Sequence, residues 1–426
     1  MFEADRRTLI EAMLMSGLVA APAGAALAQS NSLTDIGAAL QSSNTATIYV
    51  AKEIITMDDN NPTAEAVAVA DGKILGVGSL EDMRSLLTGK QEYTIDRSMA
   101  DKVVVPGFIA QHDHPLLAAL TMSSDILSIE DWELPTGTVK ALKDKDDFVT
   151  RLTAIVAAKT DPNETVLSWG YHEAFYGKLT RDELDAISDT QPIVIWGRSC
   201  HEFFLNSRAL ELSSIDEEFV SGLSESEKEQ SNLPDGHFFE QGSFAILPKI
   251  APLIVTADRF RAGLLIMRDF MHAKGITIGN EPGGVLSRAV QDGVNAVMSD
   301  ASMPFRWEFM PDGKSLVSTY GDKATVMAEI EKLKSWYSGN TRMAPGSIKL
   351  FADGAIYSLL MQTRDPYLDG HAGAWMTDLE LFENAFEMFW DEGFQIHIHV
   401  NGDAGLDRVL NTLEKNMERN PREDHR

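Results

Sequence analysis

The stretch that decides the fold is VVVPGFIAQHDHP, residues 103–115. Three valines run into a Pro-Gly pair and a short apolar step, and two histidines follow one residue apart. An apolar run rich in β-branched residues predicts a buried strand. Because side chains alternate along a strand, His112 and His114 are expected on one side and Asp113 on the other. Two imidazoles at one strand end can bind a metal ion; two half-exposed histidines without a ligand are the alternative.

Length and composition bound the class of protein. The chain has 426 residues, enough for a large enzyme domain and a smaller one. Its net charge of −27 argues against nucleic acid as a partner, because little is left to neutralise phosphates. The single cysteine, Cys200, allows neither an intrachain disulfide nor a cysteine-rich zinc module. The ten histidines are therefore the metal ligands to consider.

The first 28 residues have the pattern of an export signal. Arg6 and Arg7 precede an Ala-rich apolar run that closes with the small-x-small triplet 26–28. The arginine pair is similar to a twin-arginine signal, which predicts a periplasmic or secreted protein; an N-terminal amphipathic helix is the alternative. A polar linker is expected over 29–44. No later run reaches the ~18 apolar residues of a membrane span.

The rest of the chain first predicts β-strands and then an alternation of strands and helices. Residues 45–105 form a β-rich lead, in which 64–78 is a hairpin about the type I′ pair Asp71-Gly72. Alternating helices and strands follow, which predicts a parallel α/β sheet and, at this length, a barrel. The polar segment 221–241 is expected to be an exposed loop. Residues 377–380 have the pattern of a capping box that opens a helix.

PGFIxxHxH resembles the amidohydrolase superfamily, and further segments are similar to its YtcJ-like or amidohydrolase-3 branch. Lys349 stands in a segment similar to the family's VKxxxDG strand, and His399 in one similar to HxxGD. The resemblance implies that His112, His114, Lys349 and His399 bind one or two divalent ions, with Zn²⁺ expected and Lys349 carboxylated. The neighbouring His397 is then expected to pack or pair against another strand, and Asp353 to be a turn residue.

Softer matches point to the substrate pocket. Trp169, His172 and His201 lie in segments similar to family segments near that pocket, and a loop histidine with ordinary partners is the alternative for each histidine. Residues 277–281 follow a predicted barrel strand and could line the pocket, without an assigned role.

The resemblance implies an incomplete (β/α)8 barrel, 106–426, beside the N-terminal part of a small β-sandwich, 45–105. Three barrel units use about 95 residues, far fewer than separate His114 from Lys349, so a large insertion is expected at about 125–300. The sixth-strand histidine and the eighth-strand general-base aspartate are expected beyond Arg426. A five-strand arc cannot close and leaves its edges unpaired.

The implied activity is hydrolysis of non-peptide carbon–nitrogen bonds, in small amides or N-formyl compounds, by a metal-activated water. A homo-oligomer is compatible with the sequence. The alternatives are a catalytically inactive, truncated amidohydrolase fragment and a periplasmic binding protein, which would leave both histidine motifs without a purpose.

Overall fold

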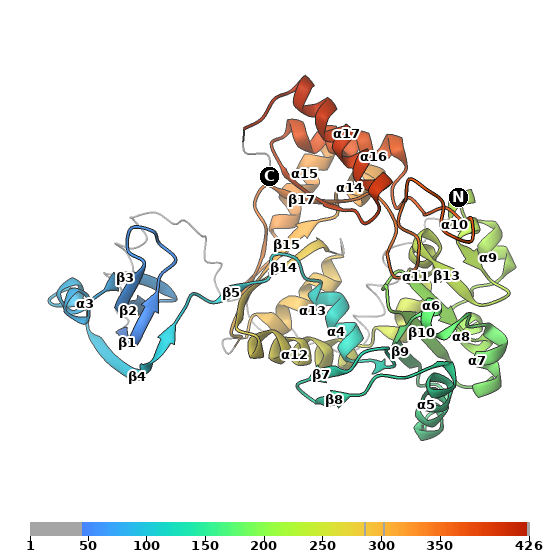
Figure 1. Cartoon of the computed structure of the whole chain (residues 1–426), viewed down its shortest axis with the longest axis horizontal. Helices are drawn as coiled ribbons and strands as arrows, with labels where there is room; N and C mark the ends of the chain where they lie inside the picture. The colour runs from blue at the N-terminus through green and yellow to red at the C-terminus, as the bar shows by residue number, and fades with distance from the viewer. Residues whose placement is uncertain (1–44, 285–286, 301–302, 424–426) are drawn as a thin grey trace. The chain divides into compact units, whose positions relative to one another are not determined.

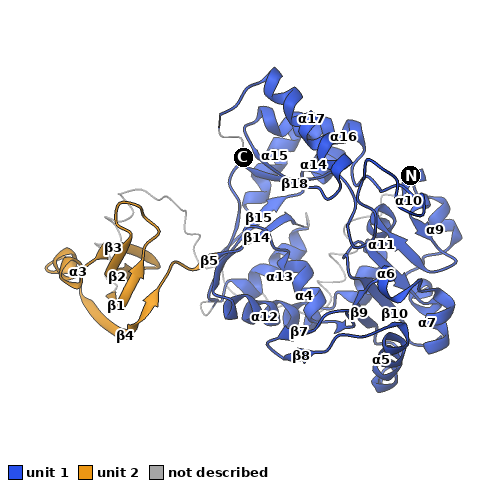
Figure 2. Ribbon diagram, viewed as in Figure 1, with its two compact units in different colours: residues 1–22, 109–426 blue, residues 23–108 orange. Residues whose placement is uncertain are grey.

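The computed structural model describes residues 45–284, 287–300 and 303–423 and divides them into two compact units (Figure 1, Figure 2). The N-terminal unit ends at Phe108, and the larger unit continues from Ile109. The expected signal peptide, 1–28, and linker, 29–44, lie outside the described residues. Within those residues, every helix is too short or too polar to span a bilayer.

The N-terminal unit is a four-stranded sheet in the order β3-β2-β1-β4. Its elements are β1 (Ala46–Ile55), β2 (Thr63–Ala70), β3 (Lys73–Gly78), α3 (Leu80–Leu87) and β4 (Tyr93–Val104). Asp71 and Gly72 have φ angles of 51° and 70°, so the predicted hairpin between β2 and β3 is confirmed. Alternate alanines and isoleucines of β1 and β2 pack with α3. The assignment of this sheet to a β-sandwich stays a prediction.

The stretch 103–115 is not one buried strand, so that prediction is wrong. Val103, the last residue but one of β4, is 52% exposed, and Phe108 in the two-residue strand β5 (Phe108–Ile109) is 59% exposed. The Pro-Gly pair between them interrupts the strand because proline has no N–H to donate. His112 and His114 therefore lie beyond β5, in the turn that leads into α4 (Pro115–Met122).

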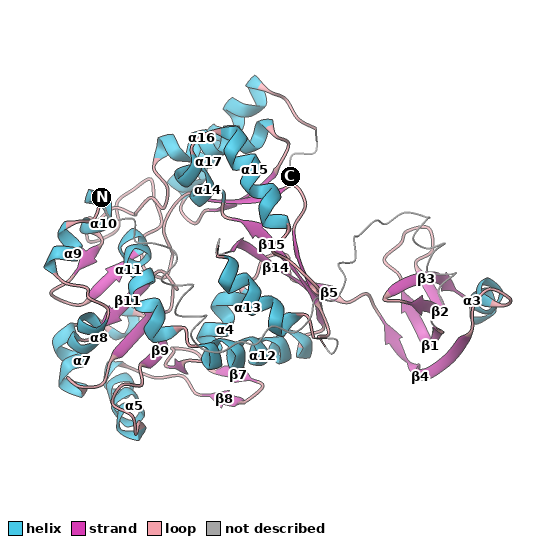
Figure 3. Cartoon of the chain, turned by 180° about the vertical axis from the view of Figure 1, so that it is seen from behind, coloured by secondary structure: helices cyan, strands magenta, loops and turns pink. Residues whose placement is uncertain are grey.

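In the larger unit, one mixed sheet of six strands has the order β12-β13-β11-β10-β9-β6 (Figure 3). The strands are β6 (Asp125–Ile126), β9 (Val166–Tyr171), β10 (Ile193–Gly197), β11 (Glu202–Leu205), β12 (Ser231–Asn232) and β13 (His237–Phe239). Strands β6, β9 and β10 run parallel, whereas β11, β13 and β12 pair antiparallel. A hairpin of β7 (Trp132–Leu134) and β8 (Gly137–Val139) follows β6.

Two apolar layers cover this sheet. The helices of this region are α5 (Lys145–Ala158), α6 (Glu173–Tyr176), α7 (Arg181–Ile187), α8 (Ser207–Leu212), α9 (Glu217–Ser221), α10 (Glu225–Glu229) and α11 (Glu240–Ile254). Alternate residues of β10 pack to opposite sides, Val194 with α8 and α11, and Ile195 with α5 and α7. The sheet is thus buried on both faces, as strands with near-continuous apolar sequence require.

A second group of strands carries the histidine and lysine motifs. The order β16-β15-β14-β5 forms one sheet, β17-β18 another, and a parallel bridge between Asp312 and Lys349 joins them. The strands are β14 (Ile276–Gly284), β15 (Arg306–Pro311), β16 (Thr341–Met343), β17 (Ser347–Phe351) and β18 (Gln395–His399). The chain therefore has an α/β fold with mixed sheets, and the expected barrel stays a prediction.

Helices cover one side of these strands. They are α12 (Ala257–Ala273), α13 (Arg288–Met298), α14 (Gly313–Tyr320), α15 (Lys323–Lys334), α16 (Leu379–Asp391) and α17 (Asp403–Arg419). Helices α4, α12 and α13 bury a core against β15, and α14 to α16 bury another against β17. Each core takes every second strand residue, which leaves the alternate side chains facing the other way.

Two local predictions are wrong. The segment 221–241 is not an exposed loop, because β12 and β13 add to the six-stranded sheet and bury Phe238 completely. The capping box at 377–380 does not form either. Thr377 donates its hydroxyl to the carbonyl of Phe351, and Asp378 takes the N-cap position of α16 without a side-chain bond. In both cases a tertiary partner replaces the local pattern.

Asp353 is more than a turn residue. It is fully buried, and its carboxylate accepts the backbone N–H groups of Gln362, Asn401 and Gly402 at 2.8, 2.9 and 2.8 Å. These bonds tie the end of β17 to the segment that follows β18. Hydrogen bonds to a charged group contribute ~1.5–3 kcal/mol each.

We expect Asp353→Asn to lower the free energy of unfolding by about 2 kcal/mol or more, because one side of an amide turns donors toward backbone donors. The measurement is the thermal unfolding midpoint. Asp365→Asn, at an exposed position twelve residues on, is the matched control and should melt as wild type does. Equal midpoints for the two variants would contradict this role of Asp353.

Candidate metal centre

Strands β17 and β18 set the direction of three candidate ligands. They pair in parallel, with Lys349 beside His397 and Phe351 beside His399. Their alternate residues, Ile348, Leu350, Ile396 and Ile398, pack into the core formed with the helices. Because strand side chains alternate, Lys349, His397 and His399 all face away from that core. His397 thus shares the ligand face, and its buried Nε2 has no hydrogen-bond partner among the described residues.

His112 and His114 approach this face from the turn after β5. Their Nε2 atoms are 3.3 Å apart, and the two rings meet edge to face. Asp113, between them, turns the other way and accepts the backbone N–H of Asn280 at 2.6 Å. Burial raises the pKa of Asp113 to about 7, although that hydrogen bond opposes the rise. The predicted split of the three side chains is therefore present without a regular strand.

Glu281 of β14 fixes the orientation of His114. Its Oε1 lies 2.8 Å from Nδ1 of His114, and its Oε2 accepts the backbone N–H of Leu116 at 3.1 Å. The carboxylate is 3% exposed and also meets the N-terminus of α4, where negative charge is favourable. With Nδ1 donating to Glu281, Nε2 of His114 carries the lone pair that faces His112. A carboxylate that orients a ligating histidine in this way is common at metal sites.

The four predicted ligands act on one another electrostatically. Partial burial, with Lys349, His114 and His397 nearby, lowers the pKa of His112 to about 4. Burial also lowers the pKa of His399 to about 3, and His201, Lys349, His114 and His112 add to the shift. The structure thus brings the turn after β5 and the ends of β17 and β18 to one place. The lowered pKa values of His112 and His399 favour the neutral imidazole, which is the form that binds metals.

Lys349 is the most buried member of this cluster. It is 1% exposed, its Nζ lies 5.4 Å from the ring of Phe351, and no described residue offers Nζ a hydrogen bond or ion pair. Burial lowers its pKa to about 8, against the attraction of Glu281 and Asp312. Near neutral pH a fraction of this amine is therefore unprotonated, and only that form can react as a nucleophile.

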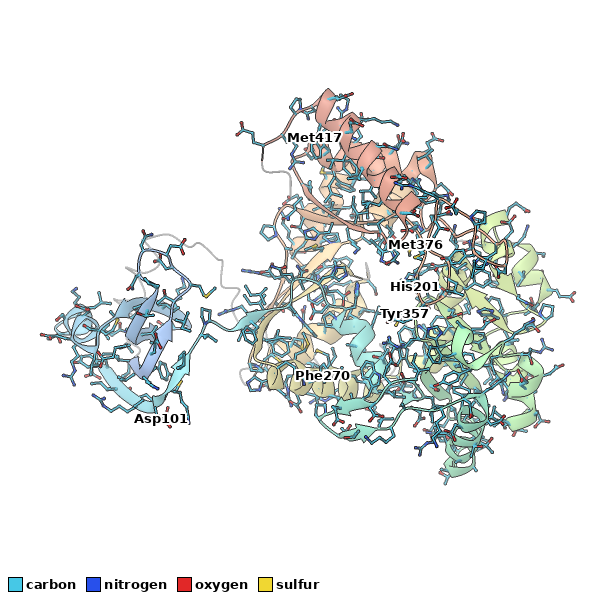
Figure 4. The ribbon with its side chains drawn as sticks, in the orientation of Figure 1. Asp101, His201, Phe270, Tyr357, Met376 and Met417 are labelled. Atoms are coloured by element: carbon cyan, nitrogen blue, oxygen red, sulfur yellow. The ribbon has the colours of Figure 1, made fainter. Side chains whose placement is uncertain are left out.

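His399 adjoins a second histidine, His201, which Figure 4 labels. Their ring centroids are 5.6 Å apart. Asn401 lies 3.0 Å from Nε2 of His399, which leaves Nδ1 as the nitrogen without a partner among the described residues. Nδ1 of His201 lies 2.9 Å from the fully buried carboxylate of Glu240, whose other oxygen accepts the backbone N–H of Ala355. The predicted pocket residue His201 is thus beside the cluster.

Trp169 and His172 are not part of this cluster. Trp169 is 3% exposed, donates to Sγ of Cys200 and lies against the guanidinium of Arg198. His172 contacts the rings of Phe175 and Tyr357. Trp169 lies in β9 of the six-stranded sheet, and His172 directly follows this strand. Their role in substrate binding stays a prediction.

Sequence reasoning missed two acidic residues that organise the site. Glu281 lay in a segment without an assigned role, and Glu240 lay in the segment expected to be an exposed loop. Two residues at this contact have left-handed backbone angles: Cys200, directly before His201, has a φ angle of 64°, and Glu240, the partner of His201, has a φ angle of 42°. The available signal in the sequence for Glu240 was an acidic residue directly before an apolar run, the start of α11.

The residues present fit a divalent cation. Three imidazoles and one buried amine gather where His112 and His114 direct their Nε2 atoms, and two of these imidazoles, His112 and His399, have lowered pKa values. The carboxylate of Glu281 acts on this place only indirectly, because it lies behind the imidazole of His114. Histidine nitrogens suit Zn²⁺ and other borderline metals, and a carboxylated Lys349 would add the missing oxygen ligand.

The sequence of the chain is similar to that of known proteins. A model of the amidohydrolase family matches residues 99–426. Exoenzymes regulatory protein AepA of Pectobacterium carotovorum subsp. carotovorum is 23% identical over 384 residues, 88% of this chain and 78% of that protein. The YtcJ protein of Bacillus subtilis (strain 168) is 24% identical over 394 residues, 87% of this chain and 66% of YtcJ. N-substituted formamide deformylase of Arthrobacter pascens is 26% identical over 370 residues, 84% of this chain and 64% of that enzyme.

Two solved structures share the fold. An uncharacterized metal-dependent hydrolase from Pyrococcus horikoshii OT3 aligns with a TM-score of 0.60 at 18% identity, over 87% of this chain and 68% of its own. Another, from Pyrococcus furiosus, aligns with a TM-score of 0.57 at 16% identity, over 87% of this chain and 70% of its own. Because the family model matches residues 99–426, well over half of the chain, this chain belongs to the amidohydrolase family.

Proposed function

We propose that this protein is a metal-dependent hydrolase of non-peptide carbon–nitrogen bonds, acting on small amides or N-formyl compounds. The observation that carries the proposal is the pair of Nε2 atoms of His112 and His114, 3.3 Å apart, with Glu281 behind one of them. Membership of the amidohydrolase family supports the same chemistry. The proposed ligands are His112, His114, Lys349 and His399, with one or two divalent ions and Zn²⁺ as the expected metal.

An incomplete (β/α)8 barrel is the architecture we propose for the strands that carry these ligands. The neighbour order β5-β14-β15, continued by the bridge to β17 and then β18, supports it, since sequential parallel strands with helices on one side are the barrel pattern. The six-stranded sheet then corresponds to the insertion proposed at about 125–300. The helix-covered sheet of the N-terminal unit is the proposed part of a β-sandwich.

A bound divalent cation would supply Lewis-acid polarisation of a carbonyl and a lowered pKa for water. The protein's own residues prepare the place for it. Glu281 fixes the tautomer of His114, and Asn401 holds Nε2 of His399. His201, held by Glu240, lies against His399 and can donate or accept a proton at the ring nitrogen that faces away from Glu240.

The substrate class rests on kinship. The Arthrobacter pascens relative is named for removing formyl groups from N-substituted formamides, and this chain covers 64% of it. We therefore propose a small amide or formamide, with Trp169, His172 and His201 as contacts. Export through a twin-arginine-like N-terminus, to the periplasm or beyond, is part of the proposal, as is a homo-oligomer. Metal content and hydrolysis, measured together, distinguish an active enzyme from the alternative of an inactive fragment.

The double variant His112→Asn, His114→Asn should lose one or more equivalents of bound metal and all hydrolysis of an N-formyl and amide panel. Metal affinity should fall more than about 100-fold, because even residues behind metal ligands contribute 10–100-fold. Metal is measured by elemental analysis and activity by amine release. His272→Asn, on the exposed face of α12, is the control. A wild-type protein that stays metal-free and inert with added Zn²⁺ would refute the proposal; metal without hydrolysis would favour the inactive fragment.

Lys349→Glu should retain metal that Lys349→Met loses, because only the first keeps a carboxylate near the position of a carboxylated lysine. Both changes remove the amine, so they are matched in that respect. Metal stoichiometry after dialysis is the measurement, made with and without bicarbonate in the wild type. Equal metal content in the two variants, with no effect of bicarbonate, would show that Lys349 is not carboxylated.

Acid should destabilise the metal-free protein through His399. Its pKa is about 3 in the folded chain and ~6.5 when unfolded. Between these values the unfolded chain binds a proton that the folded chain does not, so stability falls as pH drops below ~6.5, by at most ~1.4 kcal/mol per pH unit. His399→Asn should therefore lose less thermal stability than wild type between pH 7 and pH 5. The same slope in both proteins would contradict the buried neutral imidazole.

A further inference from the structure

A second cluster of side chains of metal-binding types lies at the six-stranded sheet, apart from the candidate metal centre. Glu173, Glu202 and His237 each direct a ligand atom into one place, and these atoms all lie within 4.8 Å of one another. Nε2 of His237 is 3.0 Å from Oε2 of Glu202, and Glu202 is 5% exposed. The cluster shares no residue with the centre of His112, His114, Lys349 and His399.

The strands build this cluster by their register. In the antiparallel pair of β11 and β13, Phe204 lies beside His237 and Glu202 beside Phe239. Glu202 and His237 thus share one face of the sheet, and the ring of His237 stacks on Phe204 with centroids 4.1 Å apart. Glu173 opens α6 directly after β9. Three separate elements therefore contribute one ligand each.

The neighbouring strand leaves room for Glu202 only because it carries a glycine. A Cβ atom on Gly197 would lie 2.2 Å from Cγ of Glu202, which is closer than two non-bonded carbon atoms can approach. Ser199 and Ser358 offer hydroxyls to the other carboxylate oxygen at 3.4 and 3.3 Å. The buried acid is thus accommodated by the sequence around it and held in one orientation.

The two bases beside the cluster, Arg198 and Lys178, are paired with other acids. The guanidinium of Arg198 is engaged with Glu130 at 2.8 Å, and Lys178 pairs with Asp235 at 2.6 Å. Among the described residues, no lysine or arginine forms an ion pair with Glu173 or Glu202. Two carboxylates therefore lie beside one imidazole, and the burial of carboxylates is costly unless a cation is present.

A further nitrogen beside the cluster is also without a partner. His172 is 8% exposed, and its Nδ1 is buried with no hydrogen bond to any described residue. His172 stands at the N-cap of α6, directly before Glu173. A buried ring nitrogen without a hydrogen-bond partner is a donor that a metal ion can use.

We propose that Glu173, Glu202 and His237 bind a divalent transition-metal ion, with His172 as a further ligand. A mixed set of imidazole nitrogens and carboxylate oxygens suits Zn²⁺ and Mn²⁺ better than Ca²⁺ or Mg²⁺, which prefer oxygen alone. The ion would join the end of β9 to β11 and β13. The ion would also hold the loop after β17, because Ser358 of that loop bonds Glu202 and Tyr357 contacts His172. Figure 4 labels Tyr357 in this loop.

The test uses the full chain in which His112→Asn and His114→Asn disable the first centre. Equilibrium dialysis with Zn²⁺ alone should give one bound ion per chain, and Zn²⁺ should raise the thermal midpoint. Adding Glu173→Gln and His237→Gln should weaken that binding about 100-fold or more, and adding His172→Asn alone about 10-fold. These readouts need no enzymatic activity, so they remain informative whether or not the proposed hydrolysis is found.

The matched control adds Glu211→Gln and His272→Asn instead, which remove the same two residue types at exposed positions. This control should still bind one Zn²⁺. Absence of bound Zn²⁺, or equal binding in the test and control chains, would overturn the proposal. If the disabled chain does not fold, the comparison is made in the wild-type background. There the test pair should lower the Zn²⁺ count by one while circular dichroism stays unchanged, and an unchanged count would again overturn it.

Discussion

The burial of Lys349 among imidazoles is the constraint around which the larger unit is arranged. The lysine is 1% exposed, and Glu281 and Asp312 favour its charged form against the effect of burial. His112, His397 and His399 all have lowered pKa values, since burial and the mutual repulsion of cations disfavour protonation. A cluster of this kind costs stability in the absence of a ligand, and such a cost is typical of functional sites.

Buried carboxylates hold the backbone around this cluster in place. Asp353, Glu240 and Glu281 each accept at least one backbone N–H, and the three are at most 3% exposed. Each joins segments remote in sequence, such as β14 with the start of α4. Because these acids accept from donors that would otherwise be buried unpaired, they fix the loops more firmly than apolar contacts could.

The alternation of β11 separates two groups of ligands. His201, just before this strand, contacts His399 and Glu240, whereas Glu202 turns toward His237 and Glu173. Two neighbouring residues thus belong to different clusters, because successive side chains of an extended chain point to opposite faces. The six-stranded sheet is therefore connected both to the candidate metal centre and to the second cluster.

The sequence by itself determined the hairpin about Asp71-Gly72 and indicated the residue types of the candidate metal centre, because each depends on a short pattern. It did not determine that His112 and His114 leave the strand, that 221–241 joins a sheet, or that Glu281 and Glu240 orient two histidines. Those features arise from contacts between residues up to 167 positions apart. Only the tertiary structure could decide them, since strand pairing and the burial of acids depend on distant partners that no local pattern names.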